Sequence, residues 1–235
     1  MMLAIYKREM RAYFTTPIGY IFMGIFLAVS GFLFGLTTLE AQTSDIGTYF
    51  TFLMFAYIVV IPLLTMKSFS EERRSKTEQL LLTSPVSLTG MVMAKFLSAF
   101  TMFLGTLIVS CLYYIPLAIY GSPNFAKFIG CMVAMLFIGM SFIAIGIFVS
   151  SVTENQFASA CLTIAVLVAL LGIAALNSLI DSYPVRFVLS WISVYSRYGN
   201  FSNGIFDFAA ALYYLSICAV FIFLTVRVYE RRRWN

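Results

Sequence analysis

The sequence has few charged residues and no histidine. Only 11% of its 235 residues are charged, whereas 61% are hydrophobic. An ordinary soluble domain is about one quarter charged. A chain with so few charges could not cover its own surface in water. The composition therefore excludes a typical soluble domain and predicts a protein that lies largely in lipid.

Motifs for catalysis and for nucleotide binding are also missing. Without histidine, the chain lacks the usual proton shuttle near neutral pH. It contains no G-x-x-x-x-G-K-[ST] loop for ATP phosphates, no H-E-x-x-H and no G-x-S-x-G. No charge lies deep in an apolar segment, which argues against an ion-coupled transporter. We therefore expect a non-catalytic protein without a cofactor.

The cysteines do not have the spacing of a metal site or of a redox motif. All four lie inside apolar segments, at Cys111, Cys131, Cys161 and Cys218. Because a free cysteine behaves as a small hydrophobic side chain, we expect these four to serve helix packing.

Six apolar segments are long enough to cross a bilayer. A helix of about 20 apolar residues spans the hydrocarbon core and satisfies its own backbone groups. A membrane β-barrel would need shorter, alternating segments. The first apolar run lacks a cleavage site, so we expect it to remain as a span. The predicted fold is an all-α membrane protein with one domain over residues 1–235. Its spans are residues 17–39, 46–66, 91–120, 126–151, 155–180 and 208–227.

Basic residues gather on one side of these spans. With an even number of spans, twelve of the 15 Lys and Arg residues fall on the side of the N-terminus, and Lys127, Arg186 and Arg197 fall on the other. This asymmetry is typical of cytoplasmic loops. We therefore expect a multi-pass protein of the plasma (inner) membrane with both termini in the cytoplasm and contacts with membrane lipids. The net charge of +5 then reflects topology, and no nucleic-acid partner is expected.

Residues 2–14 have the periodicity of an amphipathic helix in the membrane interface. At about 100° per residue, one arc is apolar and the opposite arc is basic. The apolar arc consists of Met2, Leu3, Tyr6, Met10, Tyr13 and Phe14. The basic arc consists of Lys7, Arg8 and Arg11. The helix is either a simple anchor or a lever that touches a cytoplasmic partner.

The largest hydrophilic stretch between two apolar segments runs from Lys67 to Lys95, and we call it the elbow. Residues 69–84 contain good helix formers, and Ser84-Pro85 would end a helix there. Ser68 and Glu71 have the spacing of a capping box at its start. The helix either rests on the bilayer or docks a soluble partner.

Residues 184–206, between the fifth and sixth spans, are rich in aromatic side chains. Trp and Tyr prefer the headgroup layer of a bilayer. We expect one or two short helices in the outer leaflet, roughly over residues 184–193 and 200–206. They either anchor the last span or form an outer gate. The gate residues would be Trp191, Tyr195 and Phe206.

The elbow resembles the cytoplasmic loop of ABC-2 type exporter permeases. The similar residues are EERRSKTEQLLLTSPVS, from Glu71 to Ser87, followed by Ala94-Lys95-Phe96. Lys76 and Ala94 stand where the family usually has glycine, which helix propensity should tolerate. The loop from Ser151 to Gln156 also resembles the family. The segment from Leu189 to Tyr214 is most similar to its gliding-motility and copper-enzyme-maturation branch.

The resemblance implies a transmembrane permease subunit of an ATP-driven exporter, with ATP hydrolysis on a separate chain. Two protomers, identical or paralogous, would pair and dock two ABC-type ATPase subunits. The helix over residues 69–84 would be the coupling helix. The first and fifth spans would lie near the dimer axis. The residues expected to contact the ATPase are Glu71, Glu72, Arg73, Thr77, Glu78 and Leu81.

Other functions remain as alternatives. A non-transporting scaffold could anchor an ATPase or a cell-envelope complex, and it would need no path for a cargo. An intramembrane enzyme is disfavoured by the missing acid, base and metal ligands. A lone secondary transporter would work without an ATPase. The family's cargoes include lipids, polysaccharides, drugs and peptides, and the apolar interior favours an amphipathic or lipid-like cargo.

Overall fold

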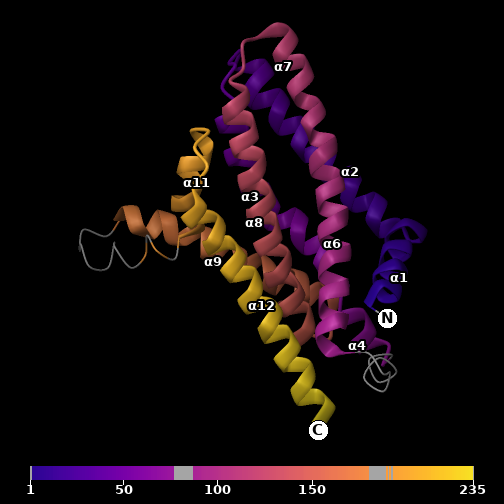
Figure 1. Ribbon diagram of the computed structural model, residues 1–235. Coiled ribbons are helices and arrows are strands. Elements are labelled where there is room, and N and C mark those ends of the chain that lie inside the picture. Colours follow the sequence, from indigo (N-terminus) through magenta and orange to yellow (C-terminus); the bar gives the residue numbers. More distant parts are fainter. Residues whose placement is uncertain (1, 77–86, 180–188, 190, 192, 235) are drawn as a thin grey trace.

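A computed structural model describes residues 2–76, 87–179, 189, 191 and 193–234 of the chain. Within this part of the chain every regular element is helical (Figure 1). The elements are α1 (Met2–Thr15), α2 (Pro17–Phe34), the π-helix η1 (Gly35–Glu40), α3 (Gly47–Thr65), α4 (Ser70–Arg74), α6 (Leu88–Ser110), the 3-10 helix η2 (Cys111–Tyr113), α7 (Tyr114–Tyr120), α8 (Phe125–Val152), α9 (Gln156–Leu179), α11 (Val194–Ser202) and α12 (Phe208–Trp234).

Six helical stretches among the described residues are long and apolar enough to cross a membrane. They correspond to the six predicted spans and confirm the all-α fold class. The start of the third stretch and the end of the last helix differ from the predicted boundaries by about three residues or more. The third stretch begins at Leu88 because the Ser87 hydroxyl caps α6 by accepting a bond from the Gly90 N–H. The last helix continues past residue 227 to Trp234. Three arginines in its last turn interact favourably with the negative end of the helix dipole.

Helix α8 forms the centre of the bundle. It contacts α3, α6, α9, α11 and α12 (Figure 1). Two thirds (67%) of its most apolar stretch is buried, against 28% for α2 and for α9. Two glycines bring its neighbours close. A Cβ atom at Gly139 or at Gly146 would lie 2.2 Å from the Phe103 ring or from the Thr65 hydroxyl, respectively. Small residues therefore set the helix spacing around α8, as is common in membrane proteins.

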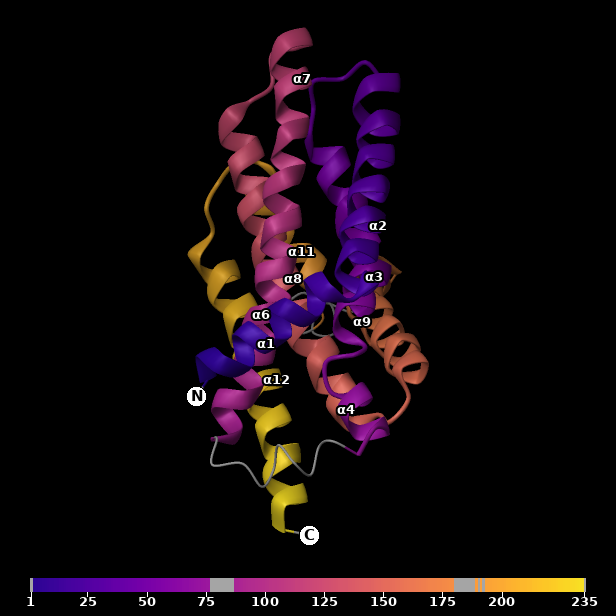
Figure 2. The ribbon, with the colours of Figure 1, turned by 90° about the vertical axis from the view of Figure 1, so that its right-hand side faces the viewer.

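Helix α1 runs across α6 and the start of α2 (Figure 2). Part of the predicted apolar arc packs on the protein. Tyr6, Met10 and Tyr13 pack on the protein core together with Ile5, which the prediction did not include. The remaining members of the arc, Met2, Leu3 and Phe14, are exposed. The Tyr6 hydroxyl donates to Thr101 on α6 at 3.1 Å. The helix is thus docked on the bundle through one side and keeps a second apolar edge free for lipid.

The elbow departs from the single helix predicted over residues 69–84. Helix α4 ends at Arg74, and Lys76 has a φ of 56°. This left-handed backbone conformation suits glycine, the residue that stands there in the resembling family, and it cannot continue a right-handed helix. The predicted capping box is also wrong, since Phe69 rather than Ser68 precedes the helix and no side chain of the N-cap bonds to it. Residues 77–86 lie outside the described part.

Replacing Lys76 with glycine is expected to stabilise the protein. A non-glycine residue in this conformation costs about 1 kcal/mol, so Lys76→Gly should raise the melting temperature in detergent. Arg74→Gly is the matched control, because Arg74 is helical and exposed and glycine there should lower stability by up to about 1 kcal/mol. An unchanged or lower melting temperature for Lys76→Gly would contradict the turn.

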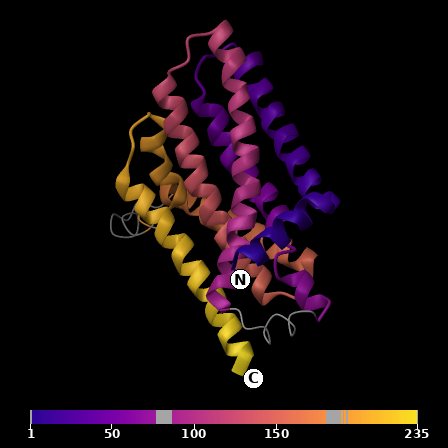
Figure 3. The same ribbon diagram turned by 45° about the vertical axis from the view of Figure 1, so that its right-hand side comes forward.

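In the outer segment, helix α11 begins and ends earlier than the helix predicted over residues 200–206. The Ser193 hydroxyl caps it by accepting from the Ser196 N–H, and Gly204, with a φ of 78°, follows its end. The helix therefore covers Val194–Ser202 instead of residues 200–206. Most of the helix predicted over residues 184–193 lies outside the described part. Figure 3 shows α12 leaving this segment and slanting back to the end of the bundle that carries α1 and α4, where both chain termini lie.

Candidate functional site

Charged side chains from several helices meet at the elbow end of the bundle. Helix α1 packs across α6, and α4 lies against α8 and the start of α9 (Figure 2). Ion pairs link these two units across the junction. We call the residues that form them the elbow cluster: Arg8, Glu9, Glu72, Arg73, Lys95 and Glu154.

Lys95 is the buried centre of the cluster. Its side chain, near the start of α6, is only 2% exposed. Its ammonium lies 2.9 Å from Glu72 on α4 and 3.3 Å from Glu9 on α1. It also donates to the carbonyl of Ser68 at 2.5 Å and lies 4.8 Å from the centre of the Phe69 ring. A buried charge persists only when it is paired and hydrogen-bonded. These contacts therefore fix the elbow against α1 and α6.

Arg8 closes a ring of alternating charges. Its guanidinium lies 2.7 Å from Glu9 and 2.9 Å from Glu72, the same two carboxylates that Lys95 contacts. Burial raises the pKa of Glu9, but the nearby charges of Lys95 and Arg8 outweigh it and hold the pKa below its ordinary value. Burial lowers the pKa of Arg8, and the bonds to Glu9 and Glu72 more than offset this effect. Glu9 and Arg8 are thus both ionised at neutral pH.

A second set of contacts holds α4 on its other side. Arg73 lies 2.7 Å from Glu154, in the turn between α8 and α9, and donates to the carbonyl of Val152 at the end of α8. The hydroxyl of Ser150 on α8 accepts from the backbone N–H groups of Phe69 and Ser70. These two donors lie at the start of α4, where N–H groups have no partner within the helix, so a residue far along the chain supplies the cap.

Helix α12 also reaches this region. Arg232 donates to the carbonyl of Ser151 at 2.8 Å, and the rings of Tyr229 and Phe69 have their centres 4.8 Å apart. The short helix α4, together with the preceding Phe69, is therefore in contact with α1, α6, α8 and α12.

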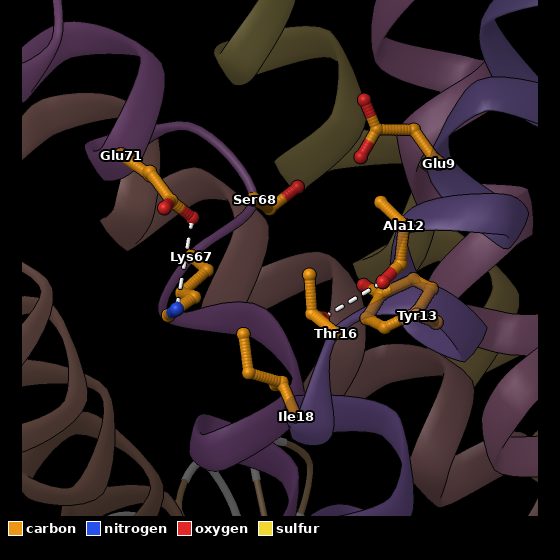
Figure 4. A pocket seen from close by; sticks show the side chains of 8 residues that line it. All are labelled: Glu9, Ala12, Tyr13, Thr16, Ile18, Lys67, Ser68 and Glu71. Carbon is orange, nitrogen blue, oxygen red and sulfur yellow. Dashed lines mark hydrogen bonds and ion pairs between the residues drawn. The ribbon is translucent and has the colours of Figure 1, made fainter.

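A small cleft of about 110 Å³ separates α1 from the elbow (Figure 4). Glu9, Tyr13 and Thr16 line it from the α1 side, and Lys67, Ser68 and Glu71 line it from the other. Lys67 and Glu71 lie 3.9 Å apart, and the Glu71 side chain is 54% exposed. Glu71 therefore presents its carboxylate to the surface, whereas Glu72 points into the ion-pair ring.

The structure separates the residues that the sequence grouped as ATPase contacts. Glu71 faces outward, while Glu72 and Arg73 bond within the chain. Thr77, Glu78 and Leu81 lie outside the described residues. On α1, Lys7 and Arg11 are exposed, and Arg8 joins the cluster.

Sequence reasoning missed Glu9, Lys95 and Glu154 as members of the cluster. One signal was available, since Glu9 is the only acidic residue of the N-terminal helix. Lys95 and Glu154 lie in segments that carry the family resemblance, but their partners are distant in the chain.

A larger, apolar cavity lies farther along the bundle. It measures about 520 Å³ between α3, α9 and α11, and it is lined by Phe55, Ile58, Val168, Leu171, Gly172, Ala174, Ala175 and Tyr195. Of the three predicted gate residues, Tyr195 lines this cavity and packs near Phe55, with ring centres 6.3 Å apart. Phe206 packs on Phe201, and Trp191 is 61% exposed. The structure thus brings only Tyr195 to the cavity.

Across the described residues, no group of three or more His, Cys, Asp or Glu side chains could hold a metal ion. The chemistry that the elbow cluster offers is ion pairing and hydrogen bonding between helices. Six apolar helices and a charged junction at one end are the features of a polytopic membrane protein.

Comparison with known families agrees with this class. A family model described as ABC-2 family transporter protein matches residues 34–228. The chain therefore belongs to the ABC-2 transporter family, which supports a permease-type role in a membrane and, in general, ABC-type ATPase partners. No curated protein gave a significant match to the chain.

Proposed function

We propose that this chain is the transmembrane permease subunit of an ATP-driven exporter, that it has no catalytic activity of its own, and that a separate ATPase drives it through α4. The observation that carries the proposal is the buried Lys95, which joins α4 to α1 and α6 through Glu72 and Glu9. A partner that binds two states of α4 with different affinity would shift these helices with it.

Each face of α4 has a separate role in this proposal. Glu71 offers an exposed carboxylate to the ATPase, whereas Glu72 and Arg73 transmit the movement to the rest of the chain. Buried, tightly packed contacts switch between discrete arrangements instead of deforming smoothly. A push on Glu71 would therefore reach α1, α6 and the turn before α9.

The path for the cargo would run beside α3 and α9. Support comes from the apolar cavity there, which is lined partly by small residues and bounded by Tyr195. A scaffold would not need such a cavity. Helices α2 and α9, the first and fifth spans, both contact α3 and have the least buried apolar stretches. They suit a dimer of two permease protomers, served by two ATPase subunits.

The membrane orientation is part of the same proposal. Both termini lie at the elbow end (Figure 3), and the basic residues gather in the same segments, so this end would face the cytoplasm of a cell with the protein in its plasma membrane. Within the family, the segment from Leu189 to Tyr214 supports the gliding-motility and copper-enzyme-maturation branch.

Purification of the tagged protein from its native cell in mild detergent tests the proposal. An ABC-type ATPase should co-purify with the wild-type chain. Glu71→Lys should reduce its capture about tenfold, equivalent to about 1.4 kcal/mol of binding free energy. Glu40→Lys is the matched control, because Glu40 is also exposed but is the last residue of η1, just before the loop that leads to α3.

Two results would overturn the proposal. Equal capture of the ATPase by Glu71→Lys and by wild type would remove α4 as the docking helix. The absence of any ATPase under several mild conditions would favour the alternative, a non-transporting scaffold.

A further inference from the structure

A long groove lies between α6, α8 and α12, apart from the cavity beside α9. It measures about 590 Å³, and most of its lining is apolar. Its walls include Met93 and Phe96 on α6, Met140 on α8, and Cys218, Ile222 and Val226 on α12. Figure 3 shows α12 slanting toward the start of α6, so the groove follows α12 to the elbow end.

The apolar part of the groove has the depth of one leaflet. Along α12 its lining begins at Leu215 and its last apolar member is Val226. Eleven residues of helix rise about 16 Å, which is close to half of the roughly 30 Å hydrocarbon core of a bilayer. The groove can thus accommodate an acyl chain of the leaflet on the elbow side.

Charged residues follow immediately on the same side of α12. Arg227, Glu230 and Arg233 are spaced by three residues, so they lie along one face of the helix. Arg227 and Glu230 also line the groove, and a second, polar cavity of about 510 Å³ is bounded by Ser87, Thr89, Glu230 and Arg233. The two cavities share Thr89 and Glu230, so they adjoin at the elbow end of the groove.

The charges alternate in sign in the order that a zwitterionic headgroup requires. Arg227 contacts Glu230 through one nitrogen, at 2.7 Å. A guanidinium has five N–H donors, and its fork geometry matches phosphate oxygens. Arg227 therefore keeps donors for a phosphate, Arg233 adds a second positive charge, and the carboxylate of Glu230 can accept from an ammonium.

We propose that this groove binds a phosphatidylethanolamine-type phospholipid. One acyl chain lies against Met93, Phe96 and Ile222. The phosphate lies at Arg227, and the ethanolamine ammonium lies at Glu230, about one turn farther along α12. The charges at the end of the groove distinguish this occupant from the transmembrane helix of another protein, whose apolar surface would leave Arg227 and Glu230 without a partner outside the chain.

Photo-crosslinking in lipid nanodiscs tests the proposal. The full-length protein is reconstituted with phosphatidylethanolamine that carries a diazirine on an acyl chain, and the labelled peptides are mapped by mass spectrometry. Labelling should concentrate on the groove-lining parts of α6 and α12. Ala219→Trp, which fills the groove, should reduce this labelling about tenfold. Val220→Trp is the matched control, because Val220 is exposed and is not among the groove-lining residues.

The headgroup is tested with a second probe. A phosphatidylglycerol probe lacks the ammonium, so wild type should label less with it than with the ethanolamine probe, and Glu230→Gln should remove this preference. Labelling spread evenly over all six spans, or unchanged in Ala219→Trp, would overturn the lipid site. A co-purifying small membrane protein that crosslinks to the groove would do the same. Equal labelling by both probes in wild type would overturn the assignment of Glu230 to the ammonium.

Discussion

Replacing Lys95 with methionine is expected to destabilise the protein by about 3 kcal/mol. Methionine fills much of the volume of the lysine stem but cannot neutralise Glu9 and Glu72, whose side chains are only 17% and 16% exposed. Two largely buried carboxylates would then face each other with Arg8 as their remaining cation in the ring. The carbonyl of Ser68 would also lose the hydrogen bond from the ammonium.

The loss of stability should appear first in the helices that Lys95 contacts. The melting temperature of Lys95→Met in detergent should fall, and amide hydrogen exchange should rise first in α1 and α4, because Lys95 joins these helices to α6. Lys67→Met is the matched control. Lys67 contacts Glu71 at 3.9 Å, and both side chains are substantially exposed, so its loss should change stability by less than about 1 kcal/mol.

A rescue separates the ion-pair ring from a general need for positive charge. Adding Glu9→Gln and Glu72→Gln to Lys95→Met removes the two uncompensated carboxylates and should recover more than half of the lost stability. Equal melting temperatures and exchange rates for Lys95→Met and wild type would show that the ring does not hold the elbow. Equal losses in Lys95→Met and Lys67→Met would show that burial of the charge is irrelevant.

Lys95→Met should also impair the coupling between the ATPase and transport. If α4 transmits movement through Lys95, the protein with Lys95→Met should still capture the ATPase, because Lys95 is buried and Glu71 is unchanged. Transport driven by that ATPase should be lost. Loss of capture together with loss of transport would instead indicate that α4 had unfolded.

The spans could be predicted from the sequence because lipid imposes a simple rule on composition. Each span is a run of about 20 apolar residues, and the helices from α2 to α12 follow these runs closely. The ends were less predictable, because a helix can continue into water beyond the apolar run. Helix α12 does so through Arg227 and the three arginines of its last turn.

The elbow cluster could not be predicted, because its contacts join residues that are far apart in the chain. Lys95 is separated by 86 residues from Glu9. Phe69 is separated by 81 residues from Ser150, whose hydroxyl accepts from its N–H at the start of α4. Hydrophobic periodicity reports which side of a helix is apolar, and it carries no information about which charged residue lies opposite another.

The turn at Lys76 shows a different limit. Helix propensity favours lysine in a helix, so the substitution of the family's glycine looked harmless. The left-handed φ of 56° depends on how the chain leaves α4 to reach α6, which is a property of the packed bundle. The glycine that the family usually has at the position of Lys76 was therefore evidence for a turn. Helix propensity alone predicted a continuous helix.

Gly139→Ala is expected to destabilise the bundle by about 2 kcal/mol, because it forces apart α6 and α8, which pack closely at that level. The new Cβ would lie 2.2, 2.5 and 2.9 Å from three atoms of the Phe103 ring. That ring is fully buried and packs against Phe26 and Tyr57, with ring centres 6.2 and 5.3 Å away. It has no free space to enter, so α6 must move away from α8. Helices in lipid associate largely through close packing, and such a displacement removes many contacts at once.

A double-mutant cycle measures this contact directly. Phe103→Leu shortens the side chain that faces Gly139, so the double variant should be more stable than the sum of the two single changes predicts, by about 1 kcal/mol or more. Gly105→Ala is the matched control on α6, because a Cβ at Gly105 would meet nothing within 4 Å, and the change should be neutral or slightly stabilising. Melting temperatures of the four proteins in one detergent give the cycle. Additive effects would mean that the added methyl group at position 139 does not interact with the Phe103 ring. The central position of α8 would then depend on its contacts with α3 and α12.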